Sequence, residues 1–425
     1  LALLAPIPRL ALIVVDEEHD PSFKQQEGLR YSARDVAVYR AKLASCPVVL
    51  GSATPSLETW HNYRCARYER LELPERASPG AQLPVVRTVD LRIAIQENGL
   101  AQALLAGLQL RLERKEQSLI FINRRGYAPV LACEACGWAA GCVRCTARMV
   151  LHSADRRLRC HHCGDQAPIP EACPTCGNVD LRPMGRGTQR VEEFLGQRFP
   201  GARIVRIDRD SARRRAELTR TLEGVRRGDA DILVGTQLLA KGHDFPDLTL
   251  VGVLNADTAL LSTDYRAAER LYAVLAQVAG RAGRRERPGE VLVQTRYPEH
   301  PLFRALATHD YAGFAESQLA ERRAAGFPPF VFEAALRAEA KKLDTALRFL
   351  RTAVASIECP QEVRCYDPVP HVLTRRAGYE RAQLLMQSPS RPALQSFLSE
   401  MTKNLSVNVP RDVRWHVDVD PIEFD

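Results

Sequence analysis

The feature that most constrains this sequence is a run of four Cys-x-x-Cys pairs in one short segment. The pairs are Cys133/Cys136, Cys142/Cys145, Cys160/Cys163 and Cys173/Cys176. Each pair places two thiolates on one side of a tight turn, and two such turns complete a tetrahedral Zn²⁺ shell. Disulfides would suit a secreted mini-domain, and a redox dithiol would not occur four times over. The segment therefore predicts two Cys₄ zinc sites.

The spacing of the pairs favours a nested arrangement of these sites. Residues 146–159 are long enough for a β-hairpin, the shape of a zinc ribbon, so the two inner pairs are predicted to share one ion. The outer pairs then share the second ion. Sequential pairing, the alternative, would have to bridge Cys136 and Cys142 with only five intervening residues, which is tight.

Length and composition set the broad class. A chain of 425 residues suggests about three domains, and 45% hydrophobic residues can form buried cores. The net charge of +8 favours a polyanionic partner without proving one. The remaining cysteines, Cys46, Cys65, Cys359 and Cys365, are expected to be reduced thiols, which predicts a cytoplasmic location. No stretch reaches the roughly 18 apolar residues of a membrane helix, so no membrane partner is expected.

An acidic tetrapeptide follows the first apolar run. Residues 9–15 are typical of a parallel strand covered on both faces, and they lead into Asp16-Glu17-Glu18-His19. Carboxylates at this end of a strand lie where α/β sheets bind ligands. In nucleotide motors one such carboxylate holds Mg²⁺ and the next positions and deprotonates water. A strand followed by a polar helix start is the alternative interpretation.

A second strand, at 47–50, leads into the small-residue turn Gly51-Ser52-Ala53-Thr54. Its hydroxyls, including that of Thr54, can switch hydrogen bonds between a nucleotide site and nucleic acid. Together with the acidic tetrapeptide, this turn resembles motifs II and III of superfamily 2 helicases.

Aromatic and cationic residues alternate between these two motifs. Aromatic rings stack on bases and cations follow phosphates, so Phe23, Lys24, Arg30 and Tyr31 are predicted to contact single-stranded DNA. The alternative is a scaffold helix over 33–43 that turns Val36 and Tyr39 inward, and we expect both interpretations to hold in part.

The second half of the motor is predicted after an irregular, Pro-rich linker at 74–95. A helix at 100–114 and strands at 118–122, 231–235 and 250–254 indicate another α/β lobe. Gly185-Arg186-Gly187-Thr188 opens a helix at 190–198, which suits either a phosphate or a plain helix cap.

A further helix is predicted from Ala267 to Arg284. Gln277, Arg281 and Arg284 fall at i, i+4 and i+7, so one helical face presents an amide and two guanidiniums. Such guanidiniums match phosphoryl oxygens and stabilise charge during phosphoryl transfer. A solvated arginine face is the alternative.

These motifs, with Asn123-Arg124-Arg125-Gly126-Tyr127, the eight cysteines and Val234-Gly235-Thr236-Gln237, resemble the primosomal protein N′ family. The resemblance spans essentially the whole chain and implies a bacterial 3′→5′ replication-restart DNA helicase that uses ATP, Mg²⁺ and two Zn²⁺. It implies binding to stalled forks, to single-stranded-DNA-binding protein and to other primosome proteins, in a nucleoid-associated, cytoplasmic setting.

The resemblance also implies roles for individual residues. Asp16 serves Mg²⁺, Glu17 is the general base, and Arg281 and Arg284 reach the γ-phosphate. The predicted sites are, for catalysis, Asp16, Glu17, Gln277, Arg281 and Arg284; for nucleotide, Asp16, Glu17, His19, Gly242 and Asp244; and for DNA, Phe23, Lys24, Arg30, Tyr31, Thr54 and Thr236.

One part of the family pattern is missing. No Gly-x-x-x-x-Gly-Lys-Ser/Thr loop occurs in the 425 residues, and superfamily 2 motors need that loop to cradle phosphates. Because the sequence also begins with Leu, we expect a fragment with an incomplete first lobe, an open apolar edge and poor ATP hydrolysis.

The predicted fold is α/β: RecA-like helicase lobes, the first incomplete, with a double Cys₄ zinc insertion and a small α+β C-terminal domain. The expected boundaries are 1–73 for lobe one, 74–95 for the linker, 96–130 and 179–300 for lobe two, 131–178 for the zinc module and 301–425 for the C-terminal domain. Arg364, Arg375, Arg376 and Arg381 make that last domain basic, which is typical of ordinary surface charge. The family resemblance implies instead that this domain helps to bind branched DNA and the acidic tail of single-stranded-DNA-binding protein, and Arg381 is our candidate for the tail contact.

Two alternatives to a helicase remain open from the sequence. One is a non-hydrolysing scaffold that binds forks and recruits primosome proteins through the zinc module. The other is a zinc-ribbon nucleic-acid binder whose motor-like lobes serve only as structure. Glu17, Arg281 and Arg284 favour descent from a working motor, because a scaffold needs none of them.

Overall fold

The computed structural model describes most of the chain. The described residues are 2–73, 82–123, 130–133, 135–143, 148–152, 157–160, 165–183, 188–207, 215–236, 245–262, 264–283, 288–376, 378–407, 410 and 412–422. Within them, no helix is long and apolar enough to cross a membrane.

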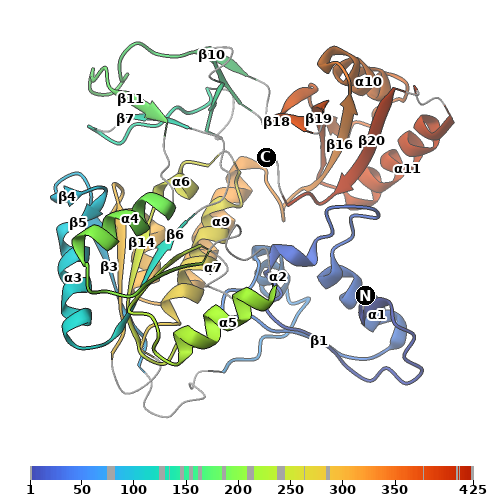
Figure 1. Cartoon of the computed structure of the whole chain (residues 1–425). Helices are drawn as coiled ribbons and strands as arrows, with labels where there is room; N and C mark the ends of the chain where they lie inside the picture. The colour runs from blue at the N-terminus through green and yellow to red at the C-terminus, as the bar shows by residue number, and fades with distance from the viewer. Residues whose placement is uncertain are drawn as a thin grey trace.

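A six-stranded, all-parallel sheet forms the core of the large α/β lobe, which lies on the left in Figure 1. Its order is β12 (Ile204–Ile207), β13 (Ile232–Gly235), β6 (Gln117–Ile122), β14 (Leu248–Leu254), β15 (Glu290–Thr295) and β3 (Val85–Asp90). Every residue of β6 and β14 is buried, as expected of central strands covered on both faces. The predicted α/β lobe is confirmed.

Helices cover both faces of this sheet. One apolar core contains residues of α3 (Gln102–Glu113) and α4 (Thr188–Arg198). The core on the other face contains residues of α5 (Arg215–Arg226), α7 (Ala267–Ala279), α8 (Pro301–Ala307) and α9 (Tyr311–Ala325). Gly252 lets α3 approach β14, because a Cβ there would lie 2.6 Å from the Leu104 side chain.

The edge strand β3 corrects the predicted linker. Residues 85–90 are not irregular but pair in parallel with β15 along its whole length. Alternating exposed and buried positions at Val85 and Val86 suit an edge strand, a pattern that the Pro-rich sequence before it obscured. The short β4 (Gln96–Glu97) and β5 (Leu100–Ala101) then form a hairpin before α3.

The N-terminal elements form a small parallel unit beside the large sheet. β1 (Ile13–Val15) pairs with β2 (Val48–Leu50), and α1 (Ala33–Ala44) connects them. After β2 come α2 (Leu57–Arg64) and the path to β3; short 3₁₀ helices η1 (Ala2–Leu4) and η2 (Pro21–Phe23) complete the unit. Val14 and Val49, on these strands, are 62% and 40% exposed.

Two smaller units follow along the chain. The zinc module contains β7 (Leu131–Cys133) paired with β11 (Leu181–Pro183), and the sheet of β8 (Val150–His152), β9 (Arg157–Arg159) and β10 (Gln166–Pro168). The β8–β9 pair is the hairpin predicted between the inner cysteine pairs.

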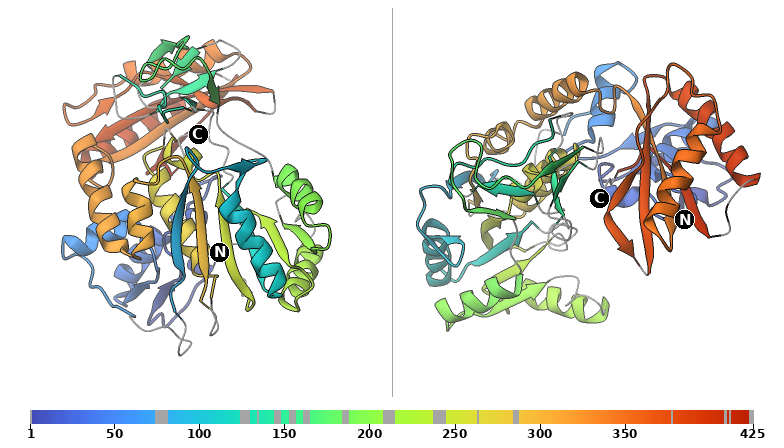
Figure 2. Two further views of the ribbon diagram at one scale, coloured as in Figure 1. Left: turned by 90° about the vertical axis from the view of Figure 1, so that its left-hand side faces the viewer. Right: turned by 90° about the horizontal axis from the view of Figure 1, so that it is seen from above.

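The C-terminal domain has an antiparallel sheet of β17 (Arg364–Cys365), β19 (Tyr379–Ser388), β16 (Phe332–Ala340) and β20 (Val413–Val419), with β18 (Val369–Arg376) also on β19. Residues of α10 (Leu343–Ala355) and α11 (Arg391–Val407) share one core with the sheet, so the predicted α+β domain is confirmed, although β18 was not predicted. Figure 2 shows this domain, in orange to red, next to the blue N-terminal elements.

Candidate functional site

The first two acidic residues lie at the open end of β1. Asp16 directly follows the strand, and its Oδ1 accepts a hydrogen bond from the Glu17 amide at 2.9 Å. Gly51, at the end of neighbouring β2, lies close by, since a Cβ there would be 3.7 Å from Asp16 Oδ1. Both carboxylates are exposed, and the Glu17 side chain retains 48% of its surface. They remain accessible to a cation and to water.

His19 joins three segments that are far apart in the sequence. Its Nδ1 lies 2.7 Å from Ser52 Oγ, and its Nε2 lies 3.3 Å from Gln277 Nε2 on α7. An amide nitrogen can only donate, so His19 Nε2 accepts and Nδ1–H donates to Ser52. The acidic tetrapeptide, the Ser-Ala-Thr turn and α7 therefore meet at His19.

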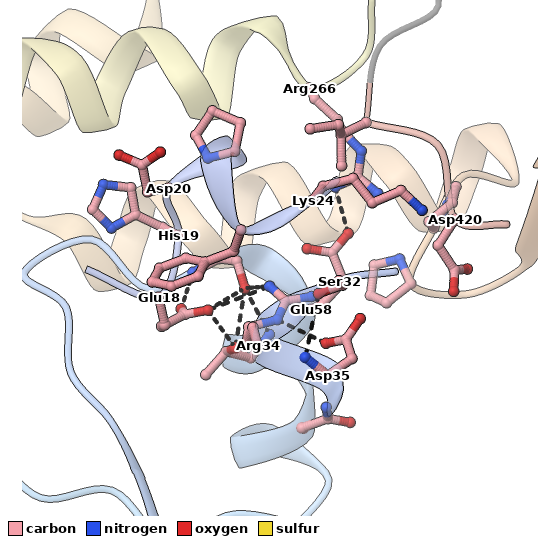
Figure 3. A pocket seen from close by; sticks show the side chains of 18 of the residues that line it. Glu18, His19, Asp20, Lys24, Ser32, Arg34, Asp35, Glu58, Arg266 and Asp420 are labelled. Carbon is pink, nitrogen blue, oxygen red and sulfur yellow. Dashed lines mark hydrogen bonds and ion pairs between the residues drawn. The ribbon is translucent and has the colours of Figure 1, made fainter. Parts of the chain in front are cut away.

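Glu18, to which the sequence motif assigns no role, is the buried member of the tetrapeptide. Its side chain has no exposed surface and accepts hydrogen bonds from the Ser56 amide at 2.6 Å and the Thr59 hydroxyl at 3.0 Å. Arg34 at the start of α1 adds a contact of 3.3 Å (Figure 3). Glu18 thus fixes the Ser-Ala-Thr turn and α2 relative to β1. Three successive acidic residues gave no sign of which one is buried.

An ion-pair network joins α2 to α7 and α9. Glu58 lies 2.5 Å from Arg266 and 3.8 Å from Arg322, and Arg322 also contacts Glu269 at 2.7 Å. Glu269 in turn accepts a hydrogen bond from the Leu57 amide at 2.8 Å. Although burial alone raises the pKa of Glu58, Arg266 and then Arg322 hold it well below its usual range. The charged network therefore ties the N-terminal unit to the large sheet.

The predicted DNA-contacting loop forms part of the wall of a cavity of about 820 Å³. Phe23, Arg30 and Tyr31 line this cavity from one side, and residues of α7 and of the C-terminal domain line it from others. Thr54 also lines the cavity and is only 4% exposed. Thr236 is half-buried at the end of β13.

The prediction that Lys24 contacts DNA is not supported by the structure. Its ammonium is buried and lies 2.9 Å from Asp418 on β20, and it also donates to the Val419 carbonyl. An ammonium held this way does not face a phosphate, so the structure does not support Lys24 as a DNA contact. Tyr39 also differs from prediction: it is 62% exposed, because Ala37 and Ala41 form the buried face of α1.

Gln277 lies on α7, but the predicted helical face that it would share with Arg281 and Arg284 does not extend past it. The helix ends at Ala279, with Gly280 as its cap, and Arg281 lies in the turn that follows. Gly283 has a φ of +69°, and its amide bonds to the Leu248 carbonyl, which redirects the chain. The i, i+4, i+7 argument therefore fails for Arg281. Arg284, Gly242 and Asp244 lie outside the described residues.

The four outer cysteines form a metal-binding geometry. The sulfurs of Cys133, Cys136, Cys173 and Cys176 all lie within 4.8 Å of one another, as the nested pairing requires. The closest pairs are Cys136 with Cys173 at 3.5 Å and Cys133 with Cys176 at 3.6 Å. Four thiolates around Zn²⁺, each bonded at about 2.3 Å, would be separated by about 3.8 Å, so this donor set fits zinc. In the inner set, Cys145 and Cys163 lie outside the described residues.

Tyr297, two residues after the end of β15, joins the zinc module to the large sheet. Its hydroxyl donates to the carbonyl of Gly137, in the first cysteine turn. Burial is the main cause that raises the pKa of Tyr297 to about 12, which keeps the hydroxyl a neutral donor. Val130 and Ala132 pack with Leu261 next to it, so the zinc module has both a polar and an apolar attachment.

In the C-terminal domain, the structure does not support Arg381 as the contact for an acidic protein tail. It is 13% exposed at its side chain and pairs with Glu339 across β16 and β19 at 3.2 Å. A paired and largely covered guanidinium is a poor anchor for an acidic tail. Arg364 and Arg375 remain exposed.

Three regions of the chain match models of known protein domains. Residues 142–168 match the model of the PriA DNA helicase Cys-rich region, residues 184–286 the helicase conserved C-terminal domain, and residues 323–422 the primosomal protein N C-terminal domain. Replication restart protein PriA of Haemophilus influenzae is 43% identical over 422 residues, covering 99% of this chain and 58% of that protein. The Bacillus subtilis protein of the same name is 37% identical over 428 residues, covering 99% of this chain and 53% of that protein.

The chain thus spans somewhat more than half the length of these curated relatives. Among solved structures, Saccharomyces cerevisiae Dbp5 bound to RNA and ADP BeF3 aligns at 14% identity with a TM-score of 0.38, covering 75% of this chain and 64% of that chain. That similarity is too low to support a functional assignment. The three domain matches and the identity to these relatives along almost the whole chain show that it is a relative of replication restart protein PriA and carries the PriA Cys-rich and C-terminal domains together with a helicase conserved C-terminal domain.

Proposed function

We propose that this chain is part of an ATP-dependent 3′→5′ DNA helicase that recognises stalled forks and initiates primosome assembly. Within that helicase, it would couple DNA binding to ATP hydrolysis. The observation that carries the proposal is the contact of His19 with both Ser52 and Gln277. It brings the acidic end of β1 within reach of α7, the arrangement that a motor needs to link nucleotide state to movement.

The exposed carboxylates suggest how the chain's own residues contribute. Asp16 would hold Mg²⁺, and Glu17 would orient and deprotonate water. Bound Mg²⁺–ATP would supply the phosphoryl group whose transfer drives movement. Gln277 would hold His19 in its tautomer, whereas Arg281 and Arg284 would stabilise phosphoryl charge. Gly242 and Asp244 would line the same nucleotide site.

The DNA and protein partners are also part of the proposal. Phe23, Arg30 and Tyr31 line the cavity next to the acidic tetrapeptide, and aromatic and cationic side chains together suit single-stranded or forked DNA. Binding to single-stranded-DNA-binding protein and to other primosome proteins is proposed from the family alone. Two Zn²⁺ ions would hold the zinc module in shape.

An ATPase assay tests the proposal. The 425 residues contain no phosphate loop, so we expect little ATP hydrolysis from them alone. In a hybrid in which this chain replaces the matching part of the Haemophilus influenzae relative, we expect hydrolysis stimulated by single-stranded DNA. Glu17→Gln in the hybrid should lower turnover by at least about 10²-fold, the usual contribution of a general base.

Glu113→Gln is the matched control, because Glu113 is exposed at the end of α3 and distant in sequence from the acidic tetrapeptide. It should leave turnover unchanged. Turnover that survives Glu17→Gln would remove Glu17 as the base. A hybrid that binds forks but never hydrolyses ATP would instead support a scaffold.

A further inference from the structure

Two thiols of the C-terminal domain lie side by side, well away in sequence from the zinc module. Cys359 is in the loop between α10 and β17, and Cys365 is the second residue of β17. Their sulfur atoms are 3.5 Å apart. Cys359 is exposed, whereas Cys365 is half-buried.

The loop that carries Cys359 is held at both ends. Ile357 and Val363 are buried in the core of the C-terminal domain. The Cys359 thiol donates to the Val363 carbonyl at 3.0 Å, which turns its sulfur toward Cys365. The two sulfurs are therefore neighbours because of the fold, and a side-chain rotation would bring them to bonding distance.

A metal site does not explain this pair. Structural zinc needs four protein ligands. Among the described residues, only Cys133, Cys136, Cys173 and Cys176 form a group of three or more clustered metal-binding side chains. Two isolated thiols lack the ligands for zinc, but they are sufficient for a disulfide.

We propose that Cys359 and Cys365 are a redox-sensitive pair that oxidised glutathione, or another small-molecule disulfide, converts to an intramolecular disulfide. Cys359 is accessible to the disulfide reagent. Cys365 lies close enough to displace the glutathione that becomes attached to Cys359. The proposal concerns a covalent modification and does not depend on the helicase assignment.

The chemistry proceeds by two thiol–disulfide exchanges. The Cys359 thiolate attacks one sulfur of oxidised glutathione, forms a mixed disulfide and releases one glutathione thiolate. The Cys365 thiolate then attacks the Cys359 sulfur and releases the second glutathione. The protein loses two protons and two electrons, and one oxidised glutathione becomes two reduced ones.

The environments of the thiols support this order. Burial, together with the neighbouring Cys359, raises the pKa of Cys365 to about 12. Cys365 is therefore a poor first nucleophile, and the exposed Cys359 reacts first. Once Cys359 is part of the mixed disulfide, its thiol no longer raises the pKa of Cys365. Cys365 can then lose its proton more readily and complete the exchange.

Peptide mapping tests the proposal directly on the 425-residue zinc-loaded protein. Trypsin cuts after Arg351, Arg364 and Arg375, so the two cysteines fall in adjacent peptides, 352–364 and 365–375. After equilibration in glutathione buffers of increasing oxidised fraction, a non-reduced digest should contain these peptides linked, with a mass about 2 Da below their sum. Reduction should separate them.

Three variants make the result specific. Cys365→Ser should stop at a glutathione adduct on Cys359, and Cys359→Ser should give no linked peptide. Cys46→Ser should leave linking unchanged. Zinc content measured in parallel shows whether the zinc cysteines have stayed out of the reaction. No linked peptides in fully oxidised buffer, or a lasting Cys359 adduct in the unsubstituted chain, would overturn the proposal.

The Cys359–Cys365 disulfide should also slow hydrogen exchange where β17 pairs with β19. The Tyr366 amide, next to Cys365, bonds to the Leu385 carbonyl at 2.9 Å and holds β17 on β19. Because the disulfide would close a short ring beside this bond, hydrogen exchange at Tyr366 should slow in the oxidised protein. Unchanged exchange in a chain shown to be linked would contradict this part.

Discussion

At the scale of single residues, several charged side chains that look like surface groups are buried with partners. Glu18 accepts hydrogen bonds from Ser56 and Thr59, and Lys24 pairs with Asp418. A buried charge is tolerated only when it is paired and hydrogen-bonded, so these residues position their neighbours instead of meeting solvent.

His416 should make the chain less stable as the pH falls from about 6.5 to about 4. Burial, followed by Arg30 and Arg337, lowers the pKa of His416 to about 4, with Asp418 opposing and Arg381 adding a smaller effect. The unfolded chain binds its proton near pH 6.5, so between these values the unfolded state holds more protons. Stability is therefore lost as the pH falls through this window.

The expected loss is about 1–2 kcal/mol, below the full value of the shift because His416 is only partly buried. Urea unfolding at pH 7 and pH 5 measures it. His416→Gln should flatten the pH dependence, and His309→Gln should retain it. An equally steep dependence in His416→Gln would show that other groups are responsible.

At the scale of elements, a close backbone approach fixes the turn after α7. A Cβ at Gly289, just before β15, would lie 2.5 Å from the carbonyl carbon of Ala282 and 2.7 Å from the Gly283 amide. Only glycine allows this approach, which holds the Arg281 turn against the start of β15.

Gly289→Ala should therefore destabilise the chain by about 1–3 kcal/mol, the usual cost of overpacking. Gly196→Ala is the control, since nothing lies within 4 Å of its Cβ position in α4 and alanine favours a helix by up to about 1 kcal/mol. Thermal unfolding of both variants measures the difference. Equal midpoints would contradict the backbone contact.

The zinc module offers a second prediction at this scale. Elemental analysis of the purified chain should give about two Zn²⁺ per chain. Cys173→Ser removes one sulfur of the outer cluster and should lower the content to about one, because the four outer sulfurs form one complete ligand set and the nested pairing predicts a separate ion for the inner cysteines. Loss of both ions in Cys173→Ser would mean that the two sites are not independent.

At the scale of the whole molecule, the C-terminal domain is attached to the N-terminal unit and α7 through its last strand. Asp418 on β20 lies 2.9 Å from Lys24 and 3.6 Å from Arg337, all with side chains below 10% exposure. Arg270 of α7 donates to the Ile422 carbonyl at 2.8 Å. The residues around the end of β20 thus join three parts of the chain.

Asp418→Asn should loosen this attachment. It leaves Lys24 and Arg337 buried without their counter-charge, which costs about 3–5 kcal/mol in comparable sites. We expect a lower first unfolding midpoint in urea and faster trypsin cleavage. Lys24→Met combined with Asp418→Leu should recover part of the loss, while the exposed Asp412→Asn should have no effect. A midpoint unchanged in Asp418→Asn would show that the ion pair does not hold the domain.

Features that depend on local spacing could be predicted from the amino-acid sequence. The outer cysteine turns meet because the insertion between them is short and contains a hairpin. Asp16 and Gly51 meet because parallel strands end at the same edge of a sheet. The burial and pairing of Lys24, Glu18 and Arg381 depend on the tertiary fold, because their partners lie 394, 38 and 42 residues away in the sequence. Residue type specifies which charges need a partner, but the packing of distant elements determines which of them is buried with one.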